Sequence, residues 1–246
     1  CGAGADEDAT SEYGWAAMMI ASENGHTDFV KVLCDAGADM EAANKNGWTA
    51  MMEASHNGHA DVVKVLCDAG ADKDVSSKKG STAMIIASQN GHTDVVKVLC
   101  DVGANKDAAN KDGGTAMMIA SQNGHTDVVK VLCDAGADKD IAQKDGWTAI
   151  MFASEYGHTD IVTVLCDAGA DKDAANKKGW TAMMTASQNG HTDVVKVLCD
   201  AGADKDASNK HGNTAMMIAS EHGHTNVVKV LCDIGADKDA TEEDGW

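Results

Sequence analysis

The chain has 246 residues with neither proline nor arginine, and its 20 lysines face 39 acidic residues, which gives a net charge of −19. A chain this acidic is repelled by the phosphates of nucleic acids and by anionic lipid surfaces, so we expect charged partners to be basic proteins. Because no apolar run approaches the roughly 18 residues that cross a bilayer, we also expect no membrane insertion.

A strict 33-residue period runs through the chain. The cysteines recur at that interval, at Cys1, Cys34, Cys67, Cys100, Cys133, Cys166, Cys199 and Cys232. Such a period is typical of a solenoid, in which each repeat buries its apolar faces against its neighbours. The period predicts seven complete repeats, at 11–43, 44–76, 77–109, 110–142, 143–175, 176–208 and 209–241. We expect 1–10 to be the tail of a preceding repeat and 242–246 to begin a further one.

Each repeat is predicted to form two short helices and an extended loop, as the repeat at 110–142 illustrates. Thr115 is a suitable N-cap for a first helix that ends at Gly124. A second helix with one apolar face follows from Thr126 and ends at Gly136. The polar, turn-rich residues that follow predict a β-like finger leading into the next repeat.

Four short motifs recur in register in these repeats. In one repeat they are Thr115-Ala116-Met117-Met118-Ile119-Ala120, Gly124-His125, Val128-Val129-Lys130-Val131-Leu132 and Gly136-Ala137-Asp138. The pattern resembles the ankyrin repeat, whose hallmark is Thr-Pro-Leu-His-x-Ala, then Gly-His, Val-Val-x-Leu-Leu and Gly-Ala-Asp. The resemblance covers essentially the whole chain. It implies an all-α, ankyrin-repeat solenoid of stacked helix-turn-helix units with β-like fingers.

Two departures from the hallmark concern the start of the first helix. Alanine replaces the hallmark proline, and methionine or isoleucine replaces the hallmark histidine. Alanine is a good helix former, so the helix should persist. The loss of that histidine should remove a polar link within and between repeats and leave adaptable methionine packing.

The cysteines are not expected to form disulfides. Corresponding residues of stacked helices should lie about 8–10 Å apart, whereas a disulfide requires Cα atoms within roughly 7 Å. We therefore predict a small, buried apolar side chain at this position of the second helix. Reduced thiols fit an intracellular location, so we expect the protein in the cytoplasm.

No motif predicts a metal site, a cofactor or an active site. His125 and Cys133 lie eight residues apart, about 12 Å along a helix, too far to share a zinc ion. We expect the repeated histidine to hydrogen-bond the interhelical loop instead. The Asp138-Lys139-Asp140 run begins like a calcium loop but lacks its later ligands, since Ala142 and Ala149 stand at two of those places. We predict no enzyme, no metal and no cofactor.

The repeats differ from one another on one face of the first helix and at the fingertip. The varied helix positions include Glu53 and Phe152, with further changes three and four residues later, which lie on the same face. By resemblance to ankyrin repeats, these are the groove and fingertip positions through which partners bind. The candidate contacts are Trp15, Trp48, Glu53, His56, Trp147, Phe152, Glu155, Tyr156 and Trp180. Neutral drift is the alternative, as is a tryptophan that merely covers its neighbour, although tryptophan is enriched in binding hot spots.

The sequence favours a protein-binding scaffold or adaptor with a concave, aromatic and acidic groove. The alternative is a structural spacer or spring within a large assembly, which the near-identity of the repeats favours. The repeats at 110–142 and 176–208 differ at only five positions. Neither end repeat has a polar cap, since the first keeps Met18, Met19 and Ile20, so we expect further ankyrin-like repeats of the parent chain on both sides.

Overall fold

The computed structural model describes residues 16–240, which form fourteen short α-helices. They are α1 (Ala17–Glu23), α2 (Thr27–Ala36), α3 (Ala50–Asn57), α4 (Ala60–Asp68), α5 (Ala83–Asn90), α6 (Thr93–Asp101), α7 (Ala116–Asn123), α8 (Thr126–Asp134), α9 (Ala149–Glu155), α10 (Thr159–Asp167), α11 (Ala182–Gln188), α12 (Thr192–Asp200), α13 (Ala215–Glu221) and α14 (Thr225–Asp233). In this part of the chain the extended structure is limited to two isolated antiparallel bridges, Ala109 with Thr115 and Ser208 with Thr214. The predicted all-α fold of helix pairs is confirmed.

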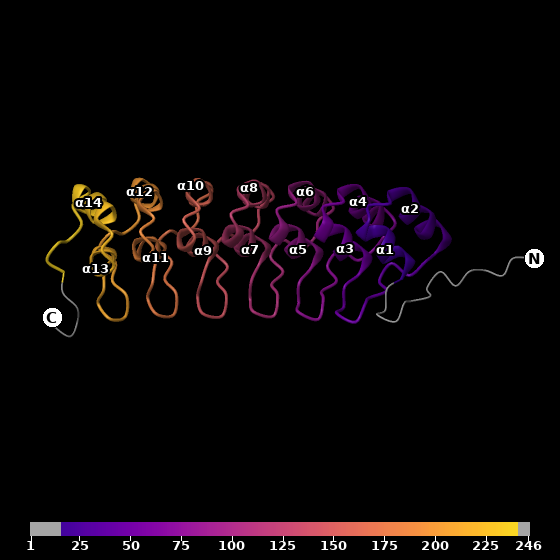
Figure 1. Cartoon of the computed structure of the whole chain (residues 1–246), viewed down its shortest axis with the longest axis horizontal. Helices are drawn as coiled ribbons and strands as arrows, with labels where there is room; N and C mark the ends of the chain where they lie inside the picture. Colours follow the sequence, from indigo (N-terminus) through magenta and orange to yellow (C-terminus); the bar gives the residue numbers. More distant parts are fainter. Residues whose placement is uncertain (1–15, 241–246) are drawn as a thin grey trace, which may run out of the picture. The chain divides into compact units, whose positions relative to one another are not determined.

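The chain divides into two compact bodies. The N-terminal body comprises Cys1–Ala116 with Asp134–Ala137, and the C-terminal body comprises Met117–Cys133 with Asp138–Trp246. In the N-terminal body α1 packs on α3 and α3 on α5, while α2 packs on α4 and α4 on α6. In the C-terminal body α9, α11 and α13 follow one another in the same way, as do α10, α12 and α14. Within each body the odd-numbered helices lie between the even-numbered helices and the finger loops (Figure 1).

The first helix of a repeat begins where a threonine takes an extended conformation. The Thr82, Thr181 and Thr214 hydroxyls each accept a hydrogen bond of 3.4 Å from the backbone N–H three residues later. Thr49 and Thr148 have the same extended geometry without that side-chain bond. The predicted threonine cap is therefore confirmed in three of the repeats, and backbone conformation alone starts the helix in two others.

The second helix buries one apolar face and leaves its charged residues in water. In α8, Val128, Val129 and Leu132 are fully buried, whereas Asp127 and Lys130 are exposed. Cys133 lies beside that face but is only half-buried. The predicted amphipathic helix is confirmed, although the cysteine position proves less buried than expected because it lies at the margin of the apolar stripe.

Consecutive repeats are joined through the histidine that precedes the second helix. Its Nε2 donates to a backbone carbonyl oxygen of the preceding repeat, since a carbonyl can only accept. The pairs are His59 with Glu23 (3.0 Å), His92 with His56 (2.8 Å), His158 with Gln122 (3.2 Å), His191 with Glu155 (3.0 Å) and His224 with Gln188 (2.9 Å). The bond therefore crosses between repeats, to the end of the preceding first helix.

A glycine makes room for that histidine ring. A Cβ atom on Gly157 would lie 2.7 Å from Nδ1 of His191, and the corresponding distance from Gly190 to His224 is the same. Both glycines also have positive φ angles, of +74° and +72°. The Gly-His motif thus acts across the junction, with the glycine of one repeat beneath the histidine of the next.

This junction predicts different costs for two glycine substitutions with similar backbone geometry. Gly157→Ala should displace the His191 ring from its carbonyl partner, whereas Gly169, with φ of +78°, has no described atom within 4 Å of its Cβ position. Both variants incur the strain of a positive φ, but only the first should lose the bond, an additional loss of about 1–3 kcal/mol. Urea denaturation followed by circular dichroism measures this difference. Equal losses would contradict the role of the junction.

Candidate functional site

An asparagine side chain at the base of the finger holds four of the described fingertips, at Asn44, Asn110, Asn176 and Asn209. In the finger before α11, Asn176 Oδ1 accepts from the backbone N–H of Lys178 at 2.9 Å and of Trp180 at 3.1 Å. The Asn176 N–H also donates to the Trp180 carbonyl at 2.9 Å, and Gly179 has a φ of +79° at the turn. These bonds fix the backbone of Trp180, whose side chain is half-buried.

A hollow of about 430 Å³ lies in the C-terminal body beside α9, α11 and the fingers that precede them. Its lining residues are Asp145, Trp147, Glu155, Asn176, Lys177, Lys178, Trp180, Thr185 and Gln188. The fingers are themselves joined, since the Lys177 N–H donates to the Asp145 carbonyl at 3.0 Å. The structure thus brings three of the predicted contacts, Trp147, Glu155 and Trp180, to one hollow.

Two further predicted contacts lie near this hollow without lining it. The Phe152 ring packs against the Trp147 ring, with 5.3 Å between ring centroids, and is half-buried. Tyr156 is 48% exposed, and its hydroxyl accepts a hydrogen bond from Gln122 Nε2 at 3.3 Å. Phe152 therefore supports an indole ring, whereas Tyr156 extends toward the preceding repeat.

The predicted contacts in the N-terminal body form a separate group. The Trp48 ring meets the exposed His56 ring edge to face, with centroids 5.5 Å apart. Glu53 is only 5% exposed, and its Oε1 accepts from Asn44 Nδ2 at 3.4 Å. Trp15, the remaining candidate, lies outside the described residues.

Burial perturbs the glutamates of both groups. Desolvation, reinforced by the nearby Glu23 carboxylate, raises the pKa of Glu53 from 4.5 to about 7. Desolvation also raises the pKa of Glu155. A carboxylate shielded from water loses hydration of its charged form, so either site would gain from a nearby positive charge.

Burial affects the thiols of five described cysteines. Burial raises the thiol pKa of Cys34, Cys67, Cys100, Cys166 and Cys199, which favours the unreactive protonated form. None of the cysteines in 16–240 forms a disulfide. Over the same residues, His, Cys, Asp and Glu side chains form no cluster of three or more that suits a metal ion.

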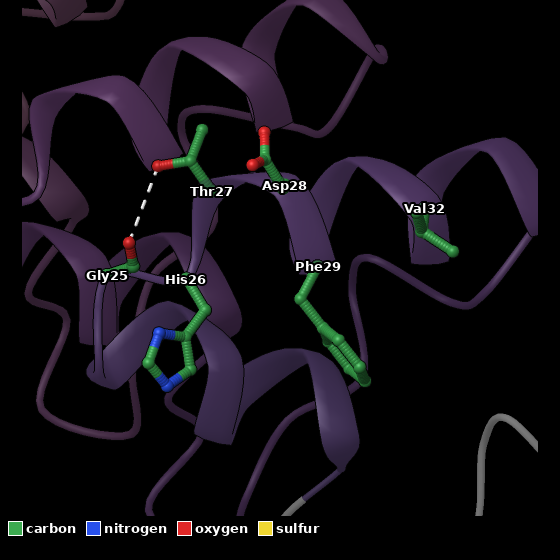
Figure 2. A pocket seen from close by; sticks show the side chains of 6 residues that line it. All are labelled: Gly25, His26, Thr27, Asp28, Phe29 and Val32. Carbon is green, nitrogen blue, oxygen red and sulfur yellow. Dashed lines mark hydrogen bonds between the residues drawn. The ribbon is translucent and has the colours of Figure 1, made fainter.

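Sequence reasoning missed a second hollow, of about 630 Å³, at α2 in the N-terminal body. It is lined by Gly25, His26, Thr27, Asp28, Phe29 and Val32, and Figure 2 shows the Phe29 and Val32 side chains projecting from the helix. Thr27 Oγ1 donates to the Gly25 carbonyl at 3.4 Å beside them. The available signal was the phenylalanine itself, because valine or isoleucine stands at the equivalent position of the other complete repeats.

The apolar surface at this hollow differs from the one expected. Phe29 is 55% and Val32 63% exposed, whereas Val62, the equivalent of Phe29 in the next repeat, is 0% exposed. Met18 and Met19, expected to form the open surface, are buried, although Ile20 is exposed. Because both methionines are buried, α2 supplies two of these three exposed apolar side chains.

Comparison with known proteins identifies the repeats. A sequence profile of ankyrin repeats, spanning three copies at a time, matches residues 1–77, 69–143, 102–176, 136–209 and 169–242. The chain belongs to the ankyrin repeat family. It is similar to the crystal structure of the ankyrin repeat domain of Bcl-3, described as a unique member of the IkappaB protein family. The TM-score is 0.81, with 27% sequence identity over 90% of this chain and 100% of that chain. No match was found among curated proteins.

Family membership defines the general class of function. Ankyrin repeats are a known protein–protein interaction fold and are generally non-enzymatic, so this ankyrin-repeat chain is a binding scaffold in that general sense. Across residues 16–240, the helices are too short and too polar for any of them to span a membrane.

Glu53 predicts a specific pH dependence of stability. Because its folded-state pKa lies above the ordinary value, the folded chain binds more protons than the unfolded chain between pH 4.5 and about 7. The Glu53 contribution is therefore fully present below pH 4.5 and is lost as the pH rises through about 7. Relative to Glu53→Gln, the wild type should lose roughly 1–3 kcal/mol of unfolding free energy between pH 5 and pH 8.

Urea denaturation at both pH values measures this loss. Glu221→Gln, at an exposed position, should retain the wild-type pH dependence. Parallel pH profiles for the wild type and Glu53→Gln would rule out a strongly raised pKa in the folded chain.

Proposed function

We propose that the chain is an adaptor or scaffold that binds a partner protein through its first-helix groove and its fingertips. The supporting observation is the hollow that Trp147 and Trp180 line together from successive repeats. Large aromatic side chains held partly buried before binding lose little conformational freedom on association, and tryptophan is enriched at binding hot spots. Trp147, Glu155 and Trp180 are thus proposed as the central contacts.

The remaining candidates are proposed as surrounding contacts. Trp15, Trp48, His56, Phe152 and Tyr156 would extend the binding surface along the repeats. Glu53 is almost fully buried, so it would affect partner binding indirectly. Its carboxylate bonds to Asn44, which also holds the backbone N–H of Trp48. The net charge of −19 favours a partner with a basic surface, and we place the protein in the cytoplasm with reduced thiols.

A structural spacer is the second candidate function. Its support is the near-identity of repeats, since those at 110–142 and 176–208 differ at only five positions. Three of the five are residues that line the hollow: Lys178, Trp180 and Thr185 stand where the other repeat has Asp112, Gly114 and Ile119. The differences therefore fall partly at the proposed contacts, which favours the scaffold over the spacer.

The scaffold proposal predicts binders that depend on the two tryptophans. Selection of a phage-displayed random peptide library against the protein should yield peptides whose affinity for Trp147→Ala/Trp180→Ala falls at least about 30-fold, corresponding to about 2 kcal/mol. The fold should persist, because the equivalent position holds Gly114 or Asn213 in other repeats. Isothermal titration calorimetry measures the affinities.

The matched control lies on the second helix of the same body. Asp193 and Lys196 form an exposed ion pair of 2.9 Å on α12, and replacing both with alanine should leave the affinities unchanged. Selected peptides that bind both variants like the wild type would favour the spacer.

We further propose that the exposed face formed by Ile20, Phe29 and Val32 receives another ankyrin repeat of the parent chain. The support is that Val62 and Val95, at the position of Phe29 in the next two repeats, are completely buried. A further repeat on the C-terminal side would complete the same arrangement there. The chain would then be a segment of a longer array, divided into the repeats at 11–43, 44–76, 77–109, 110–142, 143–175, 176–208 and 209–241, with parts of repeats at 1–10 and 242–246.

This face predicts concentration-dependent association of the isolated chain. Phe29→Lys/Val32→Lys should abolish the association, because charged side chains would then have to be buried without partners. Val102→Lys, at an exposed apolar position elsewhere in the N-terminal body, should associate like the wild type. Light scattering over a concentration series gives the molar mass of each protein. A wild type that stays monomeric throughout, or a double variant that still associates, would refute the proposed use of this face.

A further inference from the structure

We propose that the hollow between Trp147 and Trp180 binds a cationic side chain, a lysine or arginine in a basic segment of the partner. This inference rests on the proposed function and specifies its chemistry. It depends on the two indole rings and on the carboxylate that lines the same hollow.

The two tryptophans come from successive fingers that are held in place before any ligand binds. The Trp147 carbonyl accepts from the Gln143 N–H at 2.9 Å, and the Trp147 ring packs on Phe152. Trp180 is fixed through Asn176, as described above. The faces of tryptophan rings attract ammonium and guanidinium groups, and two such rings at one hollow provide an aromatic surface for a single cation.

Glu155 supplies a negative charge in the same place. No hydrogen bond or ion pair from a described side chain reaches its carboxylate, although its backbone carbonyl is bonded by His191. Burial raises the pKa of this carboxyl group, so its charged form lacks full stabilisation. A bound ammonium or guanidinium group would provide the missing counter-charge and lower that pKa.

The other charged lining residues are Asp145, Lys177 and Lys178. All three are exposed, whereas Glu155 is half-buried. Exposed lysines keep their ammonium groups in water on flexible chains, so their charges are strongly screened. The half-buried Glu155 carboxylate is therefore the charge that most strongly favours a cation beside the indole rings.

A single-stranded nucleic acid is the competing ligand class, because lysines beside tryptophans also suit phosphates and stacked bases. The net charge of −19 opposes that alternative, since it repels a polyanion. The experiment includes this class as a separate arm.

The test uses the whole chain and small probes observed through the indole N–H signals of Trp147 and Trp180 in NMR spectra. n-Butylammonium chloride should shift both signals in a saturable way, with a dissociation constant in the millimolar range. n-Butanol, its neutral counterpart, should bind at least about 5-fold more weakly if charge contributes as expected. Equal binding of the two probes, or binding of a (dT)12 oligonucleotide without n-butylammonium, would overturn the proposal.

Three variants assign the effect to the proposed groups. Glu155→Gln should weaken n-butylammonium binding several-fold, whereas Glu221→Gln, the equivalent position two repeats later, should not change it. Trp180→Phe should retain more affinity than Trp180→Leu, because phenylalanine keeps an aromatic face. Equal affinities in these variants would show that the hollow is merely apolar.

The inference and the proposed function fail in different ways. If selected peptides need both tryptophans but tolerate norleucine in place of their lysines, the scaffold stands and the cation site is refuted. If no selected peptide depends on the tryptophans but n-butylammonium still binds with the expected Glu155 dependence, the cation site stands and the scaffold proposal fails.

Discussion

The hydrogen bond from the histidine of one repeat to a backbone carbonyl of the preceding repeat is the constraint on which the arrangement depends. It joins the start of one second helix to the end of the preceding first helix. The glycine beneath the histidine ring has no side chain, so the ring can lie against its backbone. Within each body this contact sets how far one repeat stands from the next. The fingers then meet at fixed positions, as the bonds from Lys78 to Asn46 and from Lys177 to Asp145 show.

A junction made by nearly invariant residues leaves the first helix and the fingertip free to vary. The same helix position holds buried Ile86 in one repeat, half-buried Phe152 in another and buried Glu53 in a third. The glutamate retains its place despite the unfavourable loss of hydration, because the surrounding helices are held by other contacts. The fingertip position likewise accepts tryptophan in some repeats and glycine or asparagine in others. Repeats with the same backbone structure therefore present chemically different surfaces.

The sequence predicted local structure well because its signals are local. Thr115, Gly124, Thr126 and Gly136 predicted the positions of α7 and α8, which span Ala116–Asn123 and Thr126–Asp134. The partner of the repeated histidine could not be predicted in the same way, because a perfect period does not show whether a polar group bonds within its own repeat or across to its neighbour. The degree of burial of Cys133 also depends on how far the adjacent helix covers the stripe.

At the candidate site, too, the sequence indicates which residues belong to adjacent repeats but not how their side chains pack. Trp147, Glu155 and Trp180 belong to adjacent repeats, and the structure places all three around one hollow. The sequence could not show that Phe152 packs on Trp147 while Tyr156 bonds to Gln122, because both outcomes depend on side-chain rotation. The exposure of Phe29 could not be predicted from the sequence, because the equivalent residues of the other repeats are also apolar and are covered in the structure.

The uniformity of the junctions has a consequence for how such a gene changes in length. Because the same glycine and histidine meet at each described junction within a body, any in-frame gain or loss of 33 codons joins two surfaces that already fit. Unequal recombination between near-identical copies can therefore alter the reach of the protein without requiring a compensating substitution. The fingertip residues travel with each copy, so the same event also changes the order in which binding surfaces are presented.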